Sequence, residues 1–211
     1  MNAILSHFRL MLCVAAGVLA LSASASAEPT VGREYSLLSN PQKAETPGKI
    51  EVLEFFSYGC PHCNDFHPLI SEWAKKLPSN VAFVRVPVSF GRPQWGALVR
   101  AYYTLQSTGD LARLDSALFD ALHKERKPLF DEASLTAWAA ANGVPADKFK
   151  ETYESFNVST RASHAEQLSR NYNVQGVPHV VIDGKYEILG SNFNDVLKNA
   201  SAVLDMINKK E

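Results

Sequence analysis

The sequence predicts a mixed α/β fold in which strands and helices alternate and one group of helices is inserted among them. Three observations carry this prediction. The apolar run Ile50 to Phe56 is typical of a strand covered on both faces, and a helical pattern follows it to about Lys76. Apolar residues then recur at helical spacing over about 93–156, which is more chain than one connection between strands requires. Strand patterns resume after that segment.

Each expected strand is a short apolar run bounded by turn residues. These runs lie at 35–38, 50–56, 81–88, 180–182 and 186–189, and we expect the first of them at an edge of the sheet. Asp183-Gly184, between the last two runs, is typical of a hairpin turn. Asn40-Pro41 and Thr46-Pro47-Gly48 interrupt regular structure and predict a loop before the second strand.

The expected helices are marked by apolar residues every three to four positions. Within 93–156 the repeating positions are Leu111, Leu114, Leu118 and Leu122, then Leu135, Trp138 and Ala139, then Phe149, Tyr153 and Phe156. We expect the aromatic residues of this insertion to form core. Further helices are predicted over 158–172 and from Phe193 to Ile207.

Residues 1–27 have the composition of a cleaved secretory signal. Arg9 precedes an apolar stretch at 10–21, and Ala25-Ser26-Ala27 supplies the small residues of a cleavage site. The apolar stretch is too short to span a bilayer, and a retained membrane anchor is the alternative. Cys13 lies in the apolar stretch and is expected to leave with the signal.

Charge and length exclude several classes of protein. Processing would leave 184 of the 211 residues, with 20 Lys and Arg against 22 Asp and Glu, because the signal holds one of the 21 basic residues and none of the acidic ones. A net charge of −2 without a basic stripe argues against nucleic-acid binding. No later segment is long and apolar enough to cross a membrane. The length suits one large domain or a domain with an insertion.

Only Cys60 and Cys63 remain after processing, and disulfides persist in exported proteins. As a structural crosslink, a four-residue ring would contribute only roughly 2 kcal/mol, against nearly 5 kcal/mol for a loop of about 100 residues. A zinc site is the other alternative, but the nearby ligands are the two cysteines, His62 and His67, without a second Cys-x-x-Cys. Two cysteines at this spacing, where a strand leads into a helix, indicate a redox-active pair.

The residues of this motif suit thiol chemistry. Pro61 fits the first helical position, which predicts Cys60 as the N-cap. Its sulfur would lie at the positive end of the helix, where a thiolate is favoured. Cys63 would lie one turn further on, more buried, in position to attack a mixed disulfide on Cys60. A protonated His62 would add positive charge; the alternative is an exposed polar residue without a role. A stabilised thiolate makes the disulfide more oxidising.

The stretch Phe55-Phe56-Ser57-Tyr58-Gly59-Cys60-Pro61-His62-Cys63 resembles the active-site strand and helix of the DsbA family of periplasmic disulfide oxidoreductases. Gly176-Val177-Pro178, followed by 180–186, is similar to the family's cis-proline loop and next hairpin. The motifs lie about 115 residues apart, and the resemblance covers nearly all of the chain after the signal. It implies a thioredoxin-like α/β fold with an inserted helical subdomain, and a strongly oxidising pair with a low thiol pKa.

The resemblance also bears on Glu54, Val177 and Pro178. Glu54 interrupts the apolar strand and would be a buried proton acceptor or a group that tunes the thiol; the alternative is a glutamate at a hydrated strand end. A cis Val177–Pro178 bond is implied, although X–Pro bonds are mostly trans. The Val177 backbone would then pair with a substrate strand. His179 has no assigned role.

The implied activity is thiol:disulfide interchange. The Cys60–Cys63 disulfide would pass to unfolded or folding exported proteins with free thiols, through a mixed disulfide at Cys60. A DsbB-like membrane quinone oxidoreductase would reoxidise the pair, so no metal and no bound cofactor is expected. We expect a periplasmic monomer, because no unpaired cysteine remains for a covalent dimer.

Three other activities are alternatives for a protein with this cysteine pair. An isomerase of the DsbC type needs a dimerisation module, for which residues 28–59 are too few. A reductase of the cytochrome-maturation type would share the cysteine pair, but neither the helical insertion nor Pro61-His62 would be expected. A peptide-binding chaperone could use the same groove without redox chemistry. The end of the chain, Asn208-Lys209-Lys210-Glu211, is not an ER retention signal, which favours a bacterial periplasm.

Overall fold

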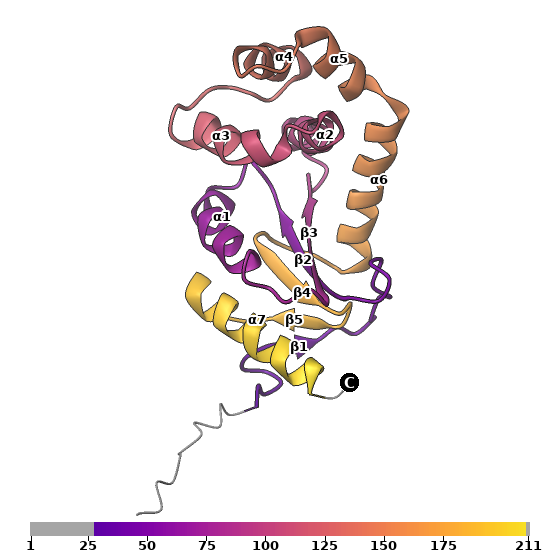
Figure 1. Cartoon of the computed structure of the whole chain (residues 1–211), viewed down its shortest axis with the longest axis vertical. Helices are drawn as coiled ribbons and strands as arrows, with labels where there is room; N and C mark the ends of the chain where they lie inside the picture. The colour runs from indigo at the N-terminus through magenta and orange to yellow at the C-terminus, as the bar shows by residue number, and fades with distance from the viewer. Residues whose placement is uncertain (1–27, 210–211) are drawn as a thin grey trace, which may run out of the picture.

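A five-stranded mixed sheet forms the centre of the computed structural model, which describes residues 28–209 (Figure 1). The expected signal segment, 1–27, with Cys13, lies outside the described residues. The strands are β1 (Tyr35–Leu37), β2 (Ile50–Phe56), β3 (Val81–Pro87), β4 (His179–Ile182) and β5 (Tyr186–Ile188). Their order across the sheet is β1-β5-β4-β2-β3. Only the β2–β3 pair is parallel among these strands.

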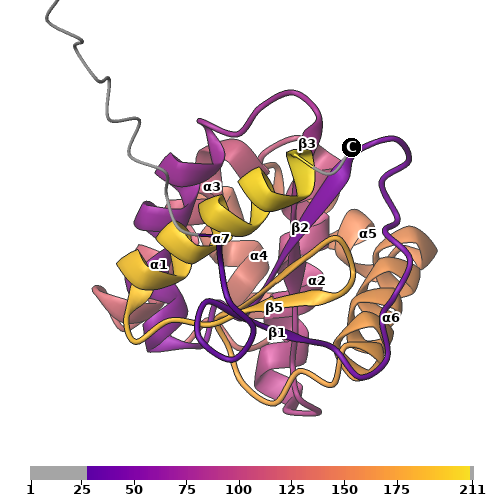
Figure 2. The ribbon, with the colours of Figure 1, turned by 90° about the horizontal axis from the view of Figure 1, so that it is seen from below.

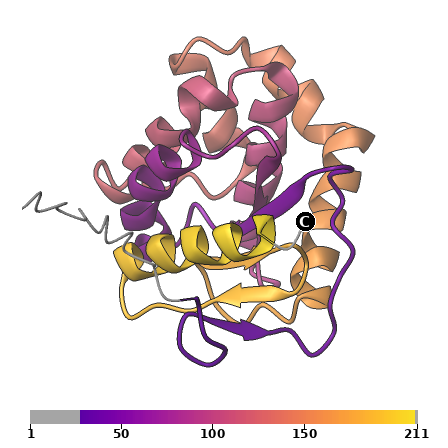
Figure 3. The same ribbon diagram turned by 60° about the horizontal axis from the view of Figure 1, so that its bottom comes forward.

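Seven helices surround the sheet in the described part of the chain. They are α1 (Pro61–Ala74), α2 (Pro93–Thr108), α3 (Leu111–His123), α4 (Glu132–Ala141), α5 (Ala146–Glu154), α6 (Phe156–Asn171) and α7 (Phe193–Asn208). Helices α1 and α7 cover one face of the sheet and α6 lies on the other side (Figures 1 and 2). Helices α2 to α5 gather beyond one end of the sheet, next to α1 (Figures 1 and 3). Among residues 28–209, none of the helices has the length and apolar character of a membrane span.

Strand β2 is central because both of its faces are covered, as its continuous apolar sequence predicts. All seven of its residues are buried. Alternation along the strand directs Val52 to the core shared with α1 and α7, and Leu53 and Phe55 to the core shared with α2, α3 and α6. Glu54 has the same parity as Val52 and therefore faces α1. The strand thus carries Glu54 beneath the helix that begins after Cys60.

The order of strands and helices agrees with the sequence prediction, and most boundaries differ by one or two residues. The burial of one residue, Phe156, was predicted wrongly. Phe156 was grouped with Phe149 and Tyr153 as core, but it is 86 % exposed. Ser155 ends α5 and caps α6, and its side chain accepts a hydrogen bond from the Val158 backbone. This break between α5 and α6 moves Phe156 off the apolar face. The limits of the insertion, about 93–156, stay a prediction.

Candidate active site

The two cysteines lie where β2 passes into α1. After β2 ends, the Cys60 backbone N–H donates to the Ser57 carbonyl at 3.1 Å, and this turn directs the chain into the helix. Cys60 is the N-cap and Pro61 the first helical residue, as predicted. The Asn64 backbone N–H donates to the Cys60 carbonyl at 3.1 Å. The Cys60 sulfur is therefore carried at the positive end of a 14-residue helix.

The two thiols differ in exposure and in proton affinity. Both are free in the structure; Cys60 is 7 % exposed and Cys63 is 0 % exposed. The pKa of Cys60 is lowered to about 6, chiefly by a hydrogen bond from the Cys63 side chain. The backbone N–H groups of Cys63 and His62 and the charge of His62 lower it further, while burial opposes the shift. Burial, and then the neighbouring Cys60, raise the pKa of Cys63 far above its usual range. Cys60 is thus the more exposed thiol of the pair and the one that ionises more readily.

The second predicted motif lies directly against Cys60. The Val177–Pro178 peptide bond is cis, as the resemblance implies. Cys60 Sγ lies 3.4 Å from the carbonyl oxygen of Val177, although the two residues are 117 positions apart in the chain. Pro61 and His62 are exposed beside this contact. The fold therefore brings the four residues of the cysteine motif and the Val177-Pro178 pair into one site.

Comparisons with known proteins agree with this arrangement. Residues 51–202 match the family model described as a DSBA-like thioredoxin domain. The chain belongs to this family.

Relatives in the DsbA family resemble the chain over most of their length. It is 40 % identical over 179 residues to the thiol:disulfide interchange protein DsbA of Pseudomonas syringae, covering 84 % of this chain and 83 % of that protein. With the protein of the same name from Burkholderia cepacia it shares 35 % identity over 211 residues, covering 100 % and 97 %. The crystal structure of Pseudomonas aeruginosa DsbA superposes with a TM-score of 0.80 at 38 % identity, covering 86 % and 97 %. The thioredoxin-like fold with a helical insertion is thereby confirmed.

Glu54 lies in the interior of this DsbA-like domain. Its side chain is 0 % exposed, so the alternative of a hydrated strand end is wrong. Burial raises its pKa, and the charge and hydrogen bond of Arg85 oppose that rise. Glu54 Oε2 accepts a hydrogen bond from Arg85 Nε at 2.6 Å, while Oε1 has no partner among residues 28–209. After burial and the neighbouring Cys60, the charge of Glu54 also contributes to the raised pKa of Cys63.

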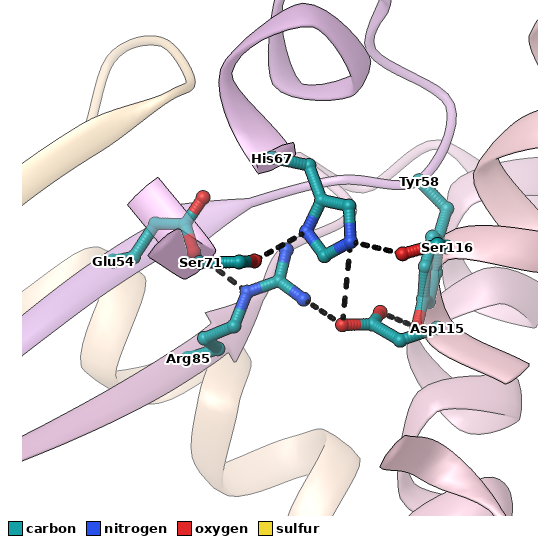
Figure 4. A network of polar contacts seen from close by, with 7 residues as sticks. All are labelled: Glu54, Tyr58, His67, Ser71, Arg85, Asp115 and Ser116. Atoms are coloured by element: carbon teal, nitrogen blue, oxygen red, sulfur yellow. Dashed lines mark hydrogen bonds and ion pairs between the residues drawn. The ribbon is translucent and has the colours of Figure 1, made fainter. Parts of the chain in front are cut away.

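The polar network around Glu54 was not predicted from the sequence. Arg85 on β3 bonds both Glu54 and Asp115 of α3, and Asp115 in turn accepts from the Tyr58 hydroxyl (Figure 4). His67 joins the same group from α1. A charged residue within the apolar strand 81–88 was the available signal for Arg85. Asp115 gave no such signal, because an acid on an amphipathic helix is usually solvated.

His179, left unassigned from sequence, is the first residue of β4 and lies near this site. Its ring is 6.0 Å from that of Phe55, and its Nδ1 is 3.6 Å from Glu187 Oε1. Its Nε2 is buried without a hydrogen-bond partner in the described part of the chain. Burial lowers its pKa, and the charge of Glu187 opposes this. These contacts are with the sheet, and none of them involves Cys60 or Cys63.

Glycine is required at position 59, immediately before Cys60, because the Trp95 indole packs closely against it. A Cβ at position 59 would lie 2.9 Å from both Cδ1 and Cε2 of the Trp95 indole and still closer to its Nε1. We expect Gly59→Ala to destabilise the protein by about 1–3 kcal/mol in urea unfolding, because the ring or the turn must move. Gly96→Ala is the matched control, because its Cβ meets nothing within 4 Å and alanine favours the α2 helix.

A second substitution separates the clash from other effects of alanine at position 59. If Trp95 causes the loss, Gly59→Ala should cost less in a Trp95→Leu background than in the natural one. Equal costs in both backgrounds would contradict the packing explanation.

Proposed function

We propose that this protein is a thiol:disulfide interchange protein, which donates its Cys60–Cys63 disulfide to exported proteins that carry free thiols. The observation that carries the proposal is the position of Cys60 at the N-terminus of α1, with its sulfur 3.4 Å from the Val177 carbonyl oxygen and with Cys63 fully buried. In keeping with this geometry, the pKa of Cys60 is lowered to about 6 and that of Cys63 is raised. A thiolate stabilised in this way stabilises the reduced protein, which makes the disulfide a good oxidant.

The first chemical step is attack on Cys60. A substrate thiolate attacks the Cys60 sulfur of the oxidised pair, because Cys63 is fully buried. The bond between Cys60 and Cys63 breaks, a substrate–Cys60 disulfide forms, and Cys63 leaves as a thiolate. Its high proton affinity requires a proton at this moment, and Glu54, whose pKa is raised by burial, is the group proposed to supply it.

The second step releases the product. A second substrate thiolate attacks the substrate sulfur of the mixed disulfide, and Cys60 leaves as a thiolate. The substrate has then lost two electrons and gained a disulfide, while the protein holds a Cys60 thiolate and a Cys63 thiol. The Val177 backbone, beside Cys60, would hold the substrate chain as an added strand during both steps.

The partners and location follow from the same proposal. Reduced protein must return two electrons to an acceptor, and a DsbB-like membrane protein that reduces quinone is the proposed partner. The secretory character of residues 1–27 supports export, and we propose a periplasmic location and a monomeric state. The substrates would be unfolded or folding polypeptides that have just been exported.

The state of the Cys60 thiol gives a direct test. We expect the thiolate absorbance of the reduced protein to titrate with a midpoint at pH of about 6. The signal should vanish in Cys60→Ser and persist in Cys63→Ala with a higher midpoint, since the Cys63 hydrogen bond is the largest stabilising contribution. A midpoint near the ordinary cysteine value of about 8.5 would contradict the proposal.

The same titration affects stability. Because folding lowers the pKa of Cys60, its thiolate stabilises the reduced protein fully above the unfolded value, and this contribution is lost as the pH falls through about 6. The free energy of unfolding of reduced protein, relative to Cys60→Ser, should therefore rise between pH 6 and about pH 8.5.

A further inference from the structure

One face of α3 holds the segment that leads into the active site. Asp115, Phe119 and His123 are spaced four residues apart and all contact Tyr58, two residues before Cys60. Asp115 Oδ1 accepts from the Tyr58 hydroxyl at 2.5 Å, and the Phe119 and Tyr58 ring centroids are 4.7 Å apart. His123 Nε2 lies 2.7 Å from the Tyr58 carbonyl oxygen. The inserted helices therefore meet the redox site through this face.

Asp115 also contacts titratable residues of β3 and α1. Its Oδ2 accepts from Arg85 Nη1 at 2.6 Å, and the same oxygen is 3.8 Å from His67 Nε2 (Figure 4). Arg85 Nε donates to Glu54 at 2.6 Å, so one guanidinium is shared by two carboxylates. That guanidinium lies over the Phe56 ring, 3.8 Å from its centroid. The group is thus shielded from water and anchored on β2, β3 and α3.

The charges in this group do not balance if both carboxylates are ionised. Two carboxylates would then face one guanidinium, because burial lowers the pKa of His67. Tyr58 and Tyr102 adjoin the group but are neutral, because burial raises the pKa of each, that of Tyr102 to about 12. Asp120 and His123 are the other titratable residues on this part of α3. Burial raises the pKa of Glu54, Arg85 lowers it, and the charge of Asp115 raises it again, so Asp115 makes Glu54 a stronger base.

We propose that Asp115 is a positioning residue for proton transfer between Glu54 and Cys63. Asp115 binds Arg85 Nη1, so the guanidinium is shared between two carboxylates and does not pair with Glu54 alone. Glu54 therefore remains basic enough to accept the proton of Cys63 and to return it. This inference rests on the proposed function and extends it to a residue of the helical insertion. The reacting sulfurs are those of Cys60 and Cys63. Asp115 does not contact them and acts through Arg85 and Glu54.

The role of Asp115 can be tested by measuring the rate of the step in which Cys63 loses its proton. Reduced protein reacts with oxidised glutathione to give a Cys60–glutathione disulfide; Cys63 then attacks Cys60, glutathione leaves as a thiolate, and the Cys63 proton passes to Glu54. In Asp115→Asn, Arg85 pairs with Glu54 alone, so Glu54 becomes a weaker base. The acid limb of the rate of glutathione release should move to lower pH by about one unit, the size of effect that one nearby charge has.

A cycle of variants shows which group Asp115 acts through. The shift caused by Asp115→Asn should disappear in a Glu54→Gln background, because no titrating carboxyl remains there. Tyr58→Phe removes the hydroxyl that Asp115 binds but leaves its charge, and should leave the acid limb in place. Asp120→Asn is the matched control on the same helix, where the carboxylate is exposed and paired with Lys124 at 2.7 Å. It should also leave the limb unchanged.

The outcomes separate this inference from the proposed function. If the natural protein does not form and release the glutathione disulfide, the proposed function fails. If it does, but Asp115→Asn leaves the acid limb in place, or shifts it equally with and without Glu54, the role of Asp115 is refuted. Circular dichroism checks folding, and Asp115→Ser provides a second neutral variant if the asparagine variant is not folded.

Discussion

Replacing Cys60 with alanine should reduce disulfide transfer to the uncatalysed rate, whereas Cys63→Ala should trap mixed disulfides. Cys60 is the more exposed cysteine of the pair and Cys63 is fully buried, so we expect the bond to substrate to form at Cys60. With Cys63→Ala, that bond has no internal thiol to resolve it. Non-reducing electrophoresis and intact mass, after mixing with an oxidised substrate peptide, measure the trapped species.

The same pair of variants addresses the chaperone alternative. A peptide-binding chaperone would assist folding through the groove beside Val177 without a thiol. Folding assistance that survives in Cys60→Ala, measured with a substrate protein that has no cysteines, would favour that reading. Equal amounts of mixed disulfide in Cys60→Ala and Cys63→Ala would contradict the assignment of Cys60 as the residue that bonds to substrate.

Replacing Arg85 with methionine should cost about 3–5 kcal/mol of stability at pH 7, because the buried carboxylate of Glu54 then loses its partner. Methionine fills most of the volume of the arginine stem, so the lost charge dominates. The cost should shrink as the pH falls, since the pKa of Glu54 is already raised by burial and a protonated Glu54 needs no cation. Urea unfolding at several pH values measures both effects.

Two further variants make the Arg85 result specific. Arg113→Met removes an exposed arginine of α3, which pairs with Asp110, and should cost no more than about 1 kcal/mol. Adding Glu54→Gln and Asp115→Asn to Arg85→Met should recover much of the loss, because no uncompensated charge remains. A loss from Arg85→Met that is independent of pH and unchanged in the triple variant would show that packing, and not charge, explains it.

The strand and helix around the cysteines were predicted well, because short-range features of the sequence determine where they begin and end. The apolar run before Cys60 can only be a covered strand, and Pro61 fixes where the helix begins. The break at Ser155 was missed because Phe156 continues the helical spacing of Phe149 and Tyr153. A single side-chain cap on the Val158 backbone overrides that spacing.

The charged group formed by Glu54, Arg85 and Asp115 could be predicted only in part. Glu54 stands out because it interrupts an apolar strand, and Arg85 does so in the same way on the next strand. The partnership of Arg85 with Asp115 depends on how α3 docks against β3, about 30 residues further along the chain. Side-chain spacing within one element cannot reveal a contact of this kind, which is set by tertiary packing.

The redox equilibrium of the purified protein against glutathione buffers, read by thiol alkylation and mass, tests the central claim most directly. We expect the Cys60–Cys63 pair to stay reduced until the buffer is strongly oxidising, because the Cys60 thiolate stabilises the reduced form. A pair that is already oxidised in reducing buffers would contradict a disulfide donor and would favour a reductase.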